Sequence, residues 1–306
     1  MTDISAINWL KLLLLGAIWG ASFMFVTVAL TGVGPLTVVA ARLSLGALFL
    51  VVLTFALGAG LPRVTGEGAG KLWFFILAMG SLSNAVPFFL LTWSQQIVAS
   101  GFAGVCMAVV PLLILPLSHI FVPGESMTLR RLIGFCVGSV GVIVLIGPGA
   151  LASTGEDFEL LARIACVGAA ACYAIGSIFT RLCPEVNRVA LAAAVLVVAA
   201  VIFTPYALWV EGMPAELSGP SLWALLYLGL LPTGVAQILL VQVIRDAGPV
   251  FLSLVNYQVP IWSVVLGAAV LSETLPPSLL LGLAMILSGV VLSQLGALRR
   301  LFGGAA

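Results

Sequence analysis

Charged residues are scarce in this chain. Asp, Glu, Lys and Arg together make up 8% of its 306 residues, whereas hydrophobic residues make up 62%. The mean hydropathy is +1.26. Ordinary globular domains are about 25% charged, so a soluble domain of this size could not cover its surface with so few polar groups. The composition therefore excludes a soluble protein and predicts that lipid surrounds most of the chain.

Several functional classes lack the residues that they need. The 12 basic and 11 acidic residues nearly balance and form no basic cluster, which argues against a nucleic-acid partner. The five cysteines have no CxxC spacing, so neither a metal site, a disulfide framework nor a cofactor is predicted. An intramembrane enzyme is the alternative from another class. It is disfavoured because His119 is the sole histidine and no acid lies deep in a predicted span.

Long stretches without a charged residue predict the membrane spans. A helix needs about 20 apolar residues to cross a bilayer, and the uncharged stretch 72–124 is long enough for two. We therefore expect an all-α membrane protein with ten transmembrane helices. Their predicted ranges are 8–30, 35–58, 71–93, 99–122, 128–147, 160–181, 189–210, 220–243, 248–271 and 275–297.

One pattern occurs twice, about 150 residues apart. Its two copies are Pro111, Glu125, Gly134 and Gly141, and Pro260, Glu273, Gly282 and Gly289. This duplication predicts a first five-helix repeat at 1–147, a periplasmic connection at 148–159 and a second five-helix repeat at 160–306. Because five is odd, the second repeat enters the membrane from the opposite side. Inverted repeats of this kind surround a central cavity in transporters.

Basic residues are concentrated on one predicted side of the membrane. If the N-terminus is cytoplasmic, ten of the twelve Lys and Arg residues lie in cytoplasmic segments, and the exceptions are Arg42 and Arg163. Cytoplasmic loops of membrane proteins carry this excess of positive charge. We therefore predict that both termini are cytoplasmic, in a bacterial-type cytoplasmic (inner) membrane.

The doubled pattern and a first span rich in Trp and Gly resemble the EamA-type drug/metabolite transporters. The first-span residues that carry the resemblance are Gly16, Trp19, Gly20, Ala21 and Ser22, and the resemblance covers 8–297. It implies ten helices in two inverted repeats, a central cavity and transport of metabolites. The overall character is most similar to the aromatic amino acid exporter branch. The second repeat departs from the pattern, since Tyr173 stands where Trp19 stands in the first.

Polar and aromatic side chains near the middle of the spans are candidates for a solute site, because burying them in hydrocarbon is costly. The predicted substrate-binding residues are Trp19, Ser22, Asn84, Tyr173, Thr233, Gln237, Ser253, Asn256, Tyr257 and Gln258. Mid-span prolines remove a backbone hydrogen bond and kink helices. Those predicted to break or gate helices are Pro87, Pro111, Pro232 and Pro260. For any one of these residues, ordinary helix packing is the alternative interpretation.

Amides, hydroxyls and aromatic rings without formal charge suit a neutral or zwitterionic solute. We therefore expect an exporter or facilitator of small metabolites, amino acids including aromatic ones foremost, that works by alternating access. A carrier of another neutral metabolite or drug, such as a nucleobase, nucleoside or sugar derivative, is the alternative.

Four ionisable residues lie in or next to the predicted spans. Arg42 either extends to the outer interface or binds a substrate carboxylate. His119 either makes an interfacial hydrogen bond or titrates. Glu125 and Glu273 are expected to cap the helices that follow them.

Small residues in the spans 128–147 and 275–297 permit close contact between helices. Packing inside a monomer is the first interpretation, and a homodimer through these fifth and tenth helices is the alternative. The other expected partners are a small-molecule solute and the lipid bilayer.

Overall fold

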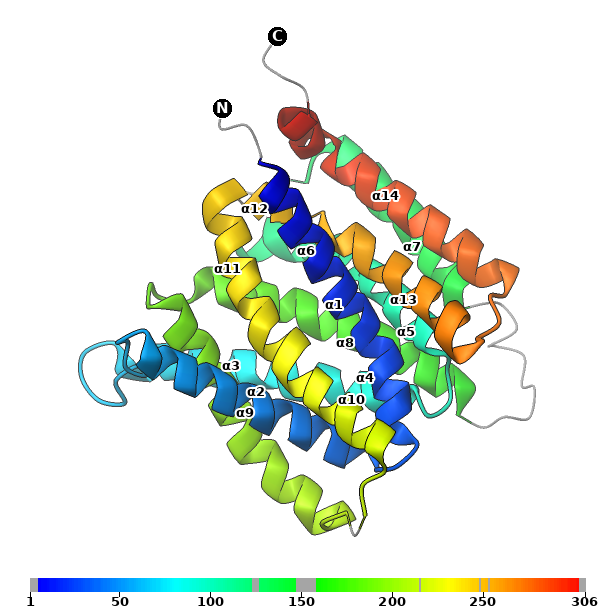
Figure 1. Cartoon of the computed structure of the whole chain (residues 1–306). Helices are drawn as coiled ribbons and strands as arrows, with labels where there is room; N and C mark the ends of the chain where they lie inside the picture. The colour runs from blue at the N-terminus through cyan, green and yellow to red at the C-terminus, as the bar shows by residue number, and fades with distance from the viewer. Residues whose placement is uncertain are drawn as a thin grey trace.

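The computed structural model describes residues 5–122, 127–146, 158–214, 216–247, 249–252 and 254–302, and the regular structure in these ranges is helical (Figure 1). The helices of the first half are α1 (Ala6–Leu30), α2 (Pro35–Ala56), α3 (Ala69–Gly80), η1 (Ser81–Ala85), α4 (Val86–Ser94), α5 (Ser100–Cys106), η2 (Met107–Val109), α6 (Val110–Phe121) and α7 (Leu129–Ile146). Those of the second half are α8 (Glu159–Leu182), α9 (Arg188–Glu211), α10 (Gly219–Leu230), η4 (Leu231–Val235), α11 (Ala236–Ala247), α12 (Pro249–Leu252), α13 (Val255–Leu271) and α14 (Pro277–Phe302).

Nine helical segments among these residues are long and apolar enough to cross a membrane. They coincide with nine of the ten predicted spans, which confirms an all-helical membrane protein. The predicted span 248–271 instead contains α12 and α13, with Leu254 in a turn just before α13, and Ser253 lies outside the described residues. The apolar helix α13 has 17 residues, a length of about 25 Å at 1.5 Å per residue.

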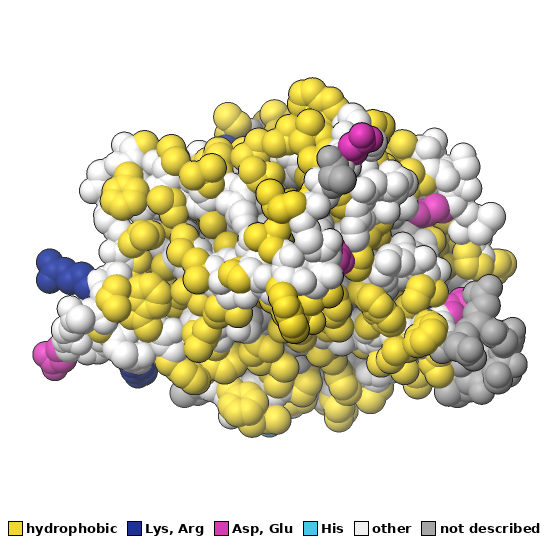
Figure 2. All heavy atoms as spheres, turned by 90° about the horizontal axis from the view of Figure 1, so that it is seen from below, with side chains coloured by type: hydrophobic (Ala, Val, Ile, Leu, Met, Phe, Trp, Pro, Cys, Tyr) yellow, Lys and Arg dark blue, Asp and Glu magenta, His cyan; other side chains and the backbone are white. Residues whose placement is uncertain are grey.

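The outer surface of the bundle is apolar. Figure 2 shows a face covered largely by hydrophobic side chains, with few charged groups among them. On the outer surface of the described residues, large side chains are exposed that a soluble protein would bury, among them Trp209 at 82% and Trp223 at 70%. A continuous apolar surface of this kind is expected where lipid is the solvent.

The two halves of the chain pack against each other rather than forming separate bodies. The most extensive pairs are α7 with α14, α2 with α9, α1 with α13, and α4 with α8, and each pair joins a helix of the first half to one of the second. Figure 1 shows α7 and α14 side by side along one flank of the bundle. Lys11 of α1 forms an ion pair with Asp246 of α11, 2.8 Å apart.

The glycines of the repeated pattern bring α7 and α14 into backbone contact. A Cβ on Gly134 would lie 2.6 Å from the carbonyl oxygen of Gly289, and a Cβ on Gly289 would lie 2.5 Å from that of Gly134. Only glycine permits an approach this close. These glycines therefore form a contact between α7 and α14 inside the monomer. A homodimer through the fifth and tenth helices stays a prediction, and it would have to use other faces of α7 and α14.

Two helices that line the interior carry a π-helical turn at matching places. These turns, η1 and η4, lie 150 residues apart, in the third and eighth spans. A π-turn leaves a carbonyl without its usual i+4 partner, and such turns often occur at functional sites. Side chains satisfy the freed groups: Asn84 Nδ2 donates to Met79 O at 3.2 Å, and Thr233 Oγ1 donates to Leu228 O at 2.8 Å.

Glu273 caps a different helix from the one predicted. Its carboxylate accepts hydrogen bonds from the backbone N–H groups of Ser100 (2.7 Å) and Gly101 (3.0 Å), at the start of α5 rather than of α14. The prediction of a local cap was wrong because α5 packs against α13 and begins beside the turn in which Glu273 lies. Glu125, the other predicted cap, lies outside the described residues.

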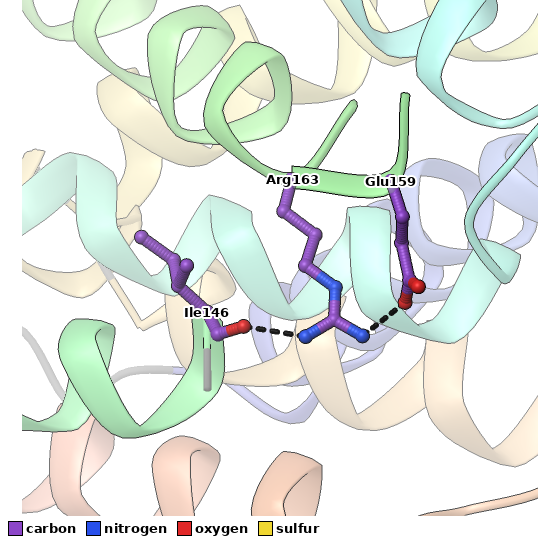
Figure 3. A network of polar contacts seen from close by, with 3 residues as sticks. All are labelled: Ile146, Glu159 and Arg163. Carbon is purple, nitrogen blue, oxygen red and sulfur yellow. Dashed lines mark hydrogen bonds and ion pairs between the residues drawn. The ribbon is translucent and has the colours of Figure 1, made fainter. Parts of the chain in front are cut away.

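The end of the first half is joined to the start of the second by Arg163. As Figure 3 shows, its guanidinium donates to the carbonyl oxygen of Ile146, at the end of α7, and pairs with Glu159 in the first turn of α8. A cation at the C-terminal end of a helix stabilises the carbonyl groups exposed there. Of the predicted connection 148–159, only residues 158 and 159 are among those described.

Candidate functional site

The interior of the bundle contains a cavity of about 380 Å³. Its walls come from both halves of the chain. The first half contributes α1, α2, η1, α4, η2 and α6, and the second half contributes α8, η4, α11 and α13. Its volume falls in the usual range of about 300–1,000 Å³ for small-molecule sites. Pockets between helices of a bundle are a common place for such sites.

Most of the predicted site residues lie on this wall. The structure brings together Trp19, Ser22, Asn84, Tyr173, Thr233, Gln237 and Asn256, with Pro232. Glycines explain how α1 presents its aromatic ring here. A Cβ on Gly16 would lie 2.7 Å from Gln258 Cβ, and one on Gly20 would collide with Trp262, so this face of α1 packs tightly on α13. Trp19, on another side of the same turn, is left to face the cavity.

Tyr257 and Gln258, which were also predicted to bind substrate, are not among the residues that line this cavity. Successive residues of a helix point about 100° apart, and α1 covers the side of α13 that carries Gln258. Each side chain has a buried oxygen that finds no hydrogen-bond partner among the described residues, namely Tyr257 OH and Gln258 Oε1. Ser253, the remaining predicted residue, lies outside the described part of the chain.

The predicted prolines lie at different kinds of places. Pro232 lines the cavity inside η4, and Pro87 follows η1 in the first turn of α4. Pro111 follows the 3₁₀ turn η2. Pro260 lies within α13, so the helical interruption of the ninth span comes before it rather than at it. Pro87, Pro111 and Pro260 are buried away from the cavity wall.

Arg42 is the one charged side chain on the described wall, so the expectation of an uncharged lining was wrong. Its guanidinium carbon lies 3.8 Å from the ring centroid of Phe88, a cation–π contact. Arg42 Nε donates to Thr233 Oγ1 at 3.1 Å. Thr233 in turn donates to Leu228 O, the carbonyl that Pro232 leaves without a backbone N–H. The charge is thus held inside the cavity, and the interpretation that it extends to the interface was wrong.

Other polar groups on the wall were missed at the sequence level. Gln95 is buried at the end of α4, with Thr92 one turn before it, and Ser177 lies one turn after Tyr173. Gln95 stands in Ser94-Gln95-Gln96, between the predicted spans 71–93 and 99–122, where polar residues are expected outside the membrane. A polar residue at a helix end can face inward as well as outward, and spacing alone does not separate the two.

Hydrogen bonds fix two of the predicted residues against the π-helical turns. Trp19 Nε1 donates to Pro232 O at 3.1 Å, and Asn84 Nδ2 donates to Met79 O. The indole ring therefore lies against the wall with its polar edge satisfied, and its apolar surface is available for contact with a solute.

A second hollow, of about 880 Å³, adjoins the cavity and extends to the turn between α8 and α9. The two share Ser83, Asn84, Gln237 and Leu240. The far end of the hollow carries Arg181, Glu185 and Arg188, which are exposed. The cavity is thus separated by four shared side chains from a hollow that reaches the end of the bundle where these charged residues lie.

A family model matches both halves of the chain. The EamA-like transporter family matches residues 7–147 and again residues 160–295. The chain belongs to this family. It is accordingly a multi-pass membrane transporter and not an enzyme, and the two matches support the presence of two repeats.

Relatives along the whole chain agree with this assignment. The uncharacterized transporter YoaV of Bacillus subtilis is 25% identical over 92% of this chain and 95% of its own. The uncharacterized inner membrane transporter YedA of Escherichia coli strain K12 is 27% identical over 91% of this chain and 88% of its own. One crystal structure has a TM-score of 0.66 at 20% identity, with coverage of 97% of this chain and 99% of that one. That likeness concerns the fold alone.

Proposed function

We propose that this EamA-family transporter moves small neutral or zwitterionic metabolites by alternating access, with amino acids, including aromatic ones, as the foremost substrates. The observation that supports this most directly is the cavity of about 380 Å³, whose wall combines Trp19, Tyr173 and Phe88 with the amides of Asn84, Gln237 and Asn256. Aromatic walls accommodate an apolar side chain, and amides accept or donate hydrogen bonds to a polar end.

The packing of the helices supports two inverted repeats, at 1–147 and 160–306. Helices at the same position in each repeat pack together, namely α2 with α9 and α7 with α14. A two-fold axis in the membrane plane predicts such pairs of equivalent elements. The matching π-turns η1 and η4 are further support.

In the proposed cycle this conformation is open toward one side. The hollow that adjoins the cavity ends at Arg181 and Arg188, which the charge distribution assigns to the cytoplasm. The protein is then an inward-open exporter or facilitator of a bacterial inner membrane, the location printed in the name of YedA.

The proposal is tested by flux into proteoliposomes with labelled amino acids, nucleosides, nucleobases and sugars. We expect saturable flux of one or more amino acids. Gln237 belongs to both the cavity and the hollow, so Gln237→Trp should obstruct the passage and abolish flux. The matched control is Val201→Trp, on the outer surface of α9 at 66% exposure, which should transport normally. No saturable flux of any solute, or normal flux through Gln237→Trp, would contradict the proposal.

A further inference from the structure

We propose that Arg42 binds the carboxylate of the transported solute, so that the cavity selects solutes with a carboxylate over neutral compounds and amines. This rests on the proposed function, and it narrows the substrate class from neutral or zwitterionic metabolites to carboxylate-bearing ones. The geometry that carries it is a guanidinium held inside the 380 Å³ cavity between Phe88 and Thr233.

An arginine inside the membrane-spanning part of a protein needs a compensating partner, because its charge is costly in a medium of low dielectric constant. No acidic side chain stands on the described wall of the cavity, and no described residue forms an ion pair with Arg42. The partners that the structure does give are a hydroxyl oxygen and an aromatic face, and neither neutralises the charge. A solute carboxylate would.

The guanidinium is also oriented for this contact. Nε is engaged by Thr233, and the ring of Phe88 covers one face of the guanidinium plane. No described residue accepts a hydrogen bond from the two terminal nitrogens of Arg42. Two terminal N–H groups in a fixed plane match the two oxygens of a carboxylate in a bidentate pair. Since Phe88 and Thr233 hold the group beforehand, little side-chain entropy remains to be lost on binding.

The remainder of the wall indicates what accompanies the carboxylate. A phosphate ester carries about two negative charges and is usually held by several cationic or backbone donors, whereas the described lining offers one cation. Phe88, Trp19 and Tyr173 line the same cavity as Arg42, and their rings favour an apolar or aromatic body. An amine without a carboxylate would meet only like charge. The geometry therefore points to a monocarboxylate, with or without an α-ammonium group.

The experiment compares acids with their own amides in binding to the full chain purified in detergent. The probes are L-phenylalanine, L-leucine and phenylacetate, each against its primary amide, together with phenethylamine and inorganic phosphate. Binding is measured by the shift in thermal unfolding and by tryptophan fluorescence, since Trp19 lines the cavity. We expect one or more acids to bind at least about tenfold more tightly than the matching amide, the magnitude of a lost charge-assisted hydrogen bond. No acid binding, equal binding of acid and amide, or tighter binding of phosphate would overturn the proposal.

Variants then assign the effect to this arginine. Arg42→Gln should weaken binding of the acid at least about tenfold while leaving that of the amide unchanged, so that the preference disappears. Arg42→Lys should restore part of the preference, because it keeps the charge and loses the bidentate geometry. The matched control Arg63→Gln changes an exposed arginine in the α2–α3 connection and should leave the preference intact. If Arg42→Gln still bound the acid more tightly than the amide, Arg42 would not be the residue that binds the carboxylate. If that variant does not fold, the comparison of acid and amide in the unmodified protein still tests the proposal.

Flux separates failure of this inference from failure of the proposed function. If neutral solutes cross proteoliposomes and no carboxylate binds, the transport function stands and the role of Arg42 is wrong. If carboxylates bind through Arg42 and no solute crosses, the site stands and the proposed function is wrong.

Discussion

A single hydroxyl group connects the backbone of the eighth span to the charge in the cavity. Thr233 Oγ1 donates to the carbonyl of Leu228 and accepts from Arg42 Nε. The first bond is needed because Pro232 has no N–H to offer that carbonyl, and in a membrane interior water does not replace it. The proline, the threonine and the arginine therefore depend on one another, although 191 residues separate Arg42 from Thr233.

The neighbours Asn256 and Tyr257 offer a matched pair of substitutions. Asn256 lines the cavity, so Asn256→Ala should lower the affinity for the solute about 2- to 10-fold, the value of one neutral hydrogen bond. Tyr257 lies off the wall, and its hydroxyl has no partner among the described residues. Tyr257→Phe should therefore transport normally and be at least as stable, because removing an unsatisfied buried group costs nothing. Flux and thermal unfolding measure both, and the reverse order of effects would show that the wall is assigned wrongly.

Two helix starts are capped by carboxylates from distant parts of the chain. Glu273 caps α5, as described above. Glu211 accepts from the backbone N–H groups of Leu36 (2.9 Å) and Thr37 (2.8 Å) at the start of α2. In each case the carboxylate belongs to the second half and the helix to the first. A negative charge at a helix N-terminus satisfies free N–H groups and interacts favourably with the helix dipole.

Removing one of these caps should loosen the contact between the halves. Glu273→Ala leaves the N–H groups of Ser100 and Gly101 without their acceptor. We expect a loss of about 1–2 kcal/mol in the free energy of unfolding, as for other helix caps. Glu216→Ala, at an exposed residue in the α9–α10 connection, is the control and should change little. Thermal unfolding in detergent measures the difference, and equal stability of the two variants would argue against a capping role.

The helices were predictable from the sequence because a span must be apolar over its whole length. Nine predicted spans coincide with observed helices. The ninth-span break and the partner of Glu273 were not predictable, since they depend on which helices become neighbours.

The same limit applies to the prediction of the cavity wall. Trp19 and Tyr173, on different helices, both lie on its wall, as expected for aromatic groups with a polar edge inside a span. Tyr257 and Gln258 lie off this wall, because composition does not reveal which side of a helix another helix covers.

The orientation of the whole molecule in the membrane is a separate prediction. Ten of twelve basic residues fall on one predicted side, which should be cytoplasmic. Reporter fusions after Ala306 and in the segment 62–70 should therefore report the cytoplasm, and fusions in 152–158 and 212–218 should report the periplasm. A cytoplasmic signal from 152–158 would contradict both the orientation and the odd number of spans in each repeat.

Energy coupling is also a property of the whole transport cycle. Proton-coupled carriers usually hold a carboxylate or histidine inside the membrane that gains and loses a proton as the site alternates. The described wall of the cavity carries neither group, and His119 lies in the last turn of α6, away from that wall. The guanidinium of Arg42 offers hydrogen-bond donors and no acceptor and keeps its proton in proteins, so it can bind an anion but is not a proton carrier.

We therefore predict a facilitator whose direction is set by the solute gradient. Flux in proteoliposomes should persist without a pH difference and should survive His119→Ala. For a carboxylate without an ammonium group, a membrane potential should change the rate, because about 2.3 kcal/mol per 100 mV acts on each net charge moved. A zwitterion bound to the same arginine carries no net charge and should be insensitive to the potential. Concentrative uptake that needs a proton gradient and is lost in His119→Ala would mean that a titrating group outside the cavity wall drives the cycle.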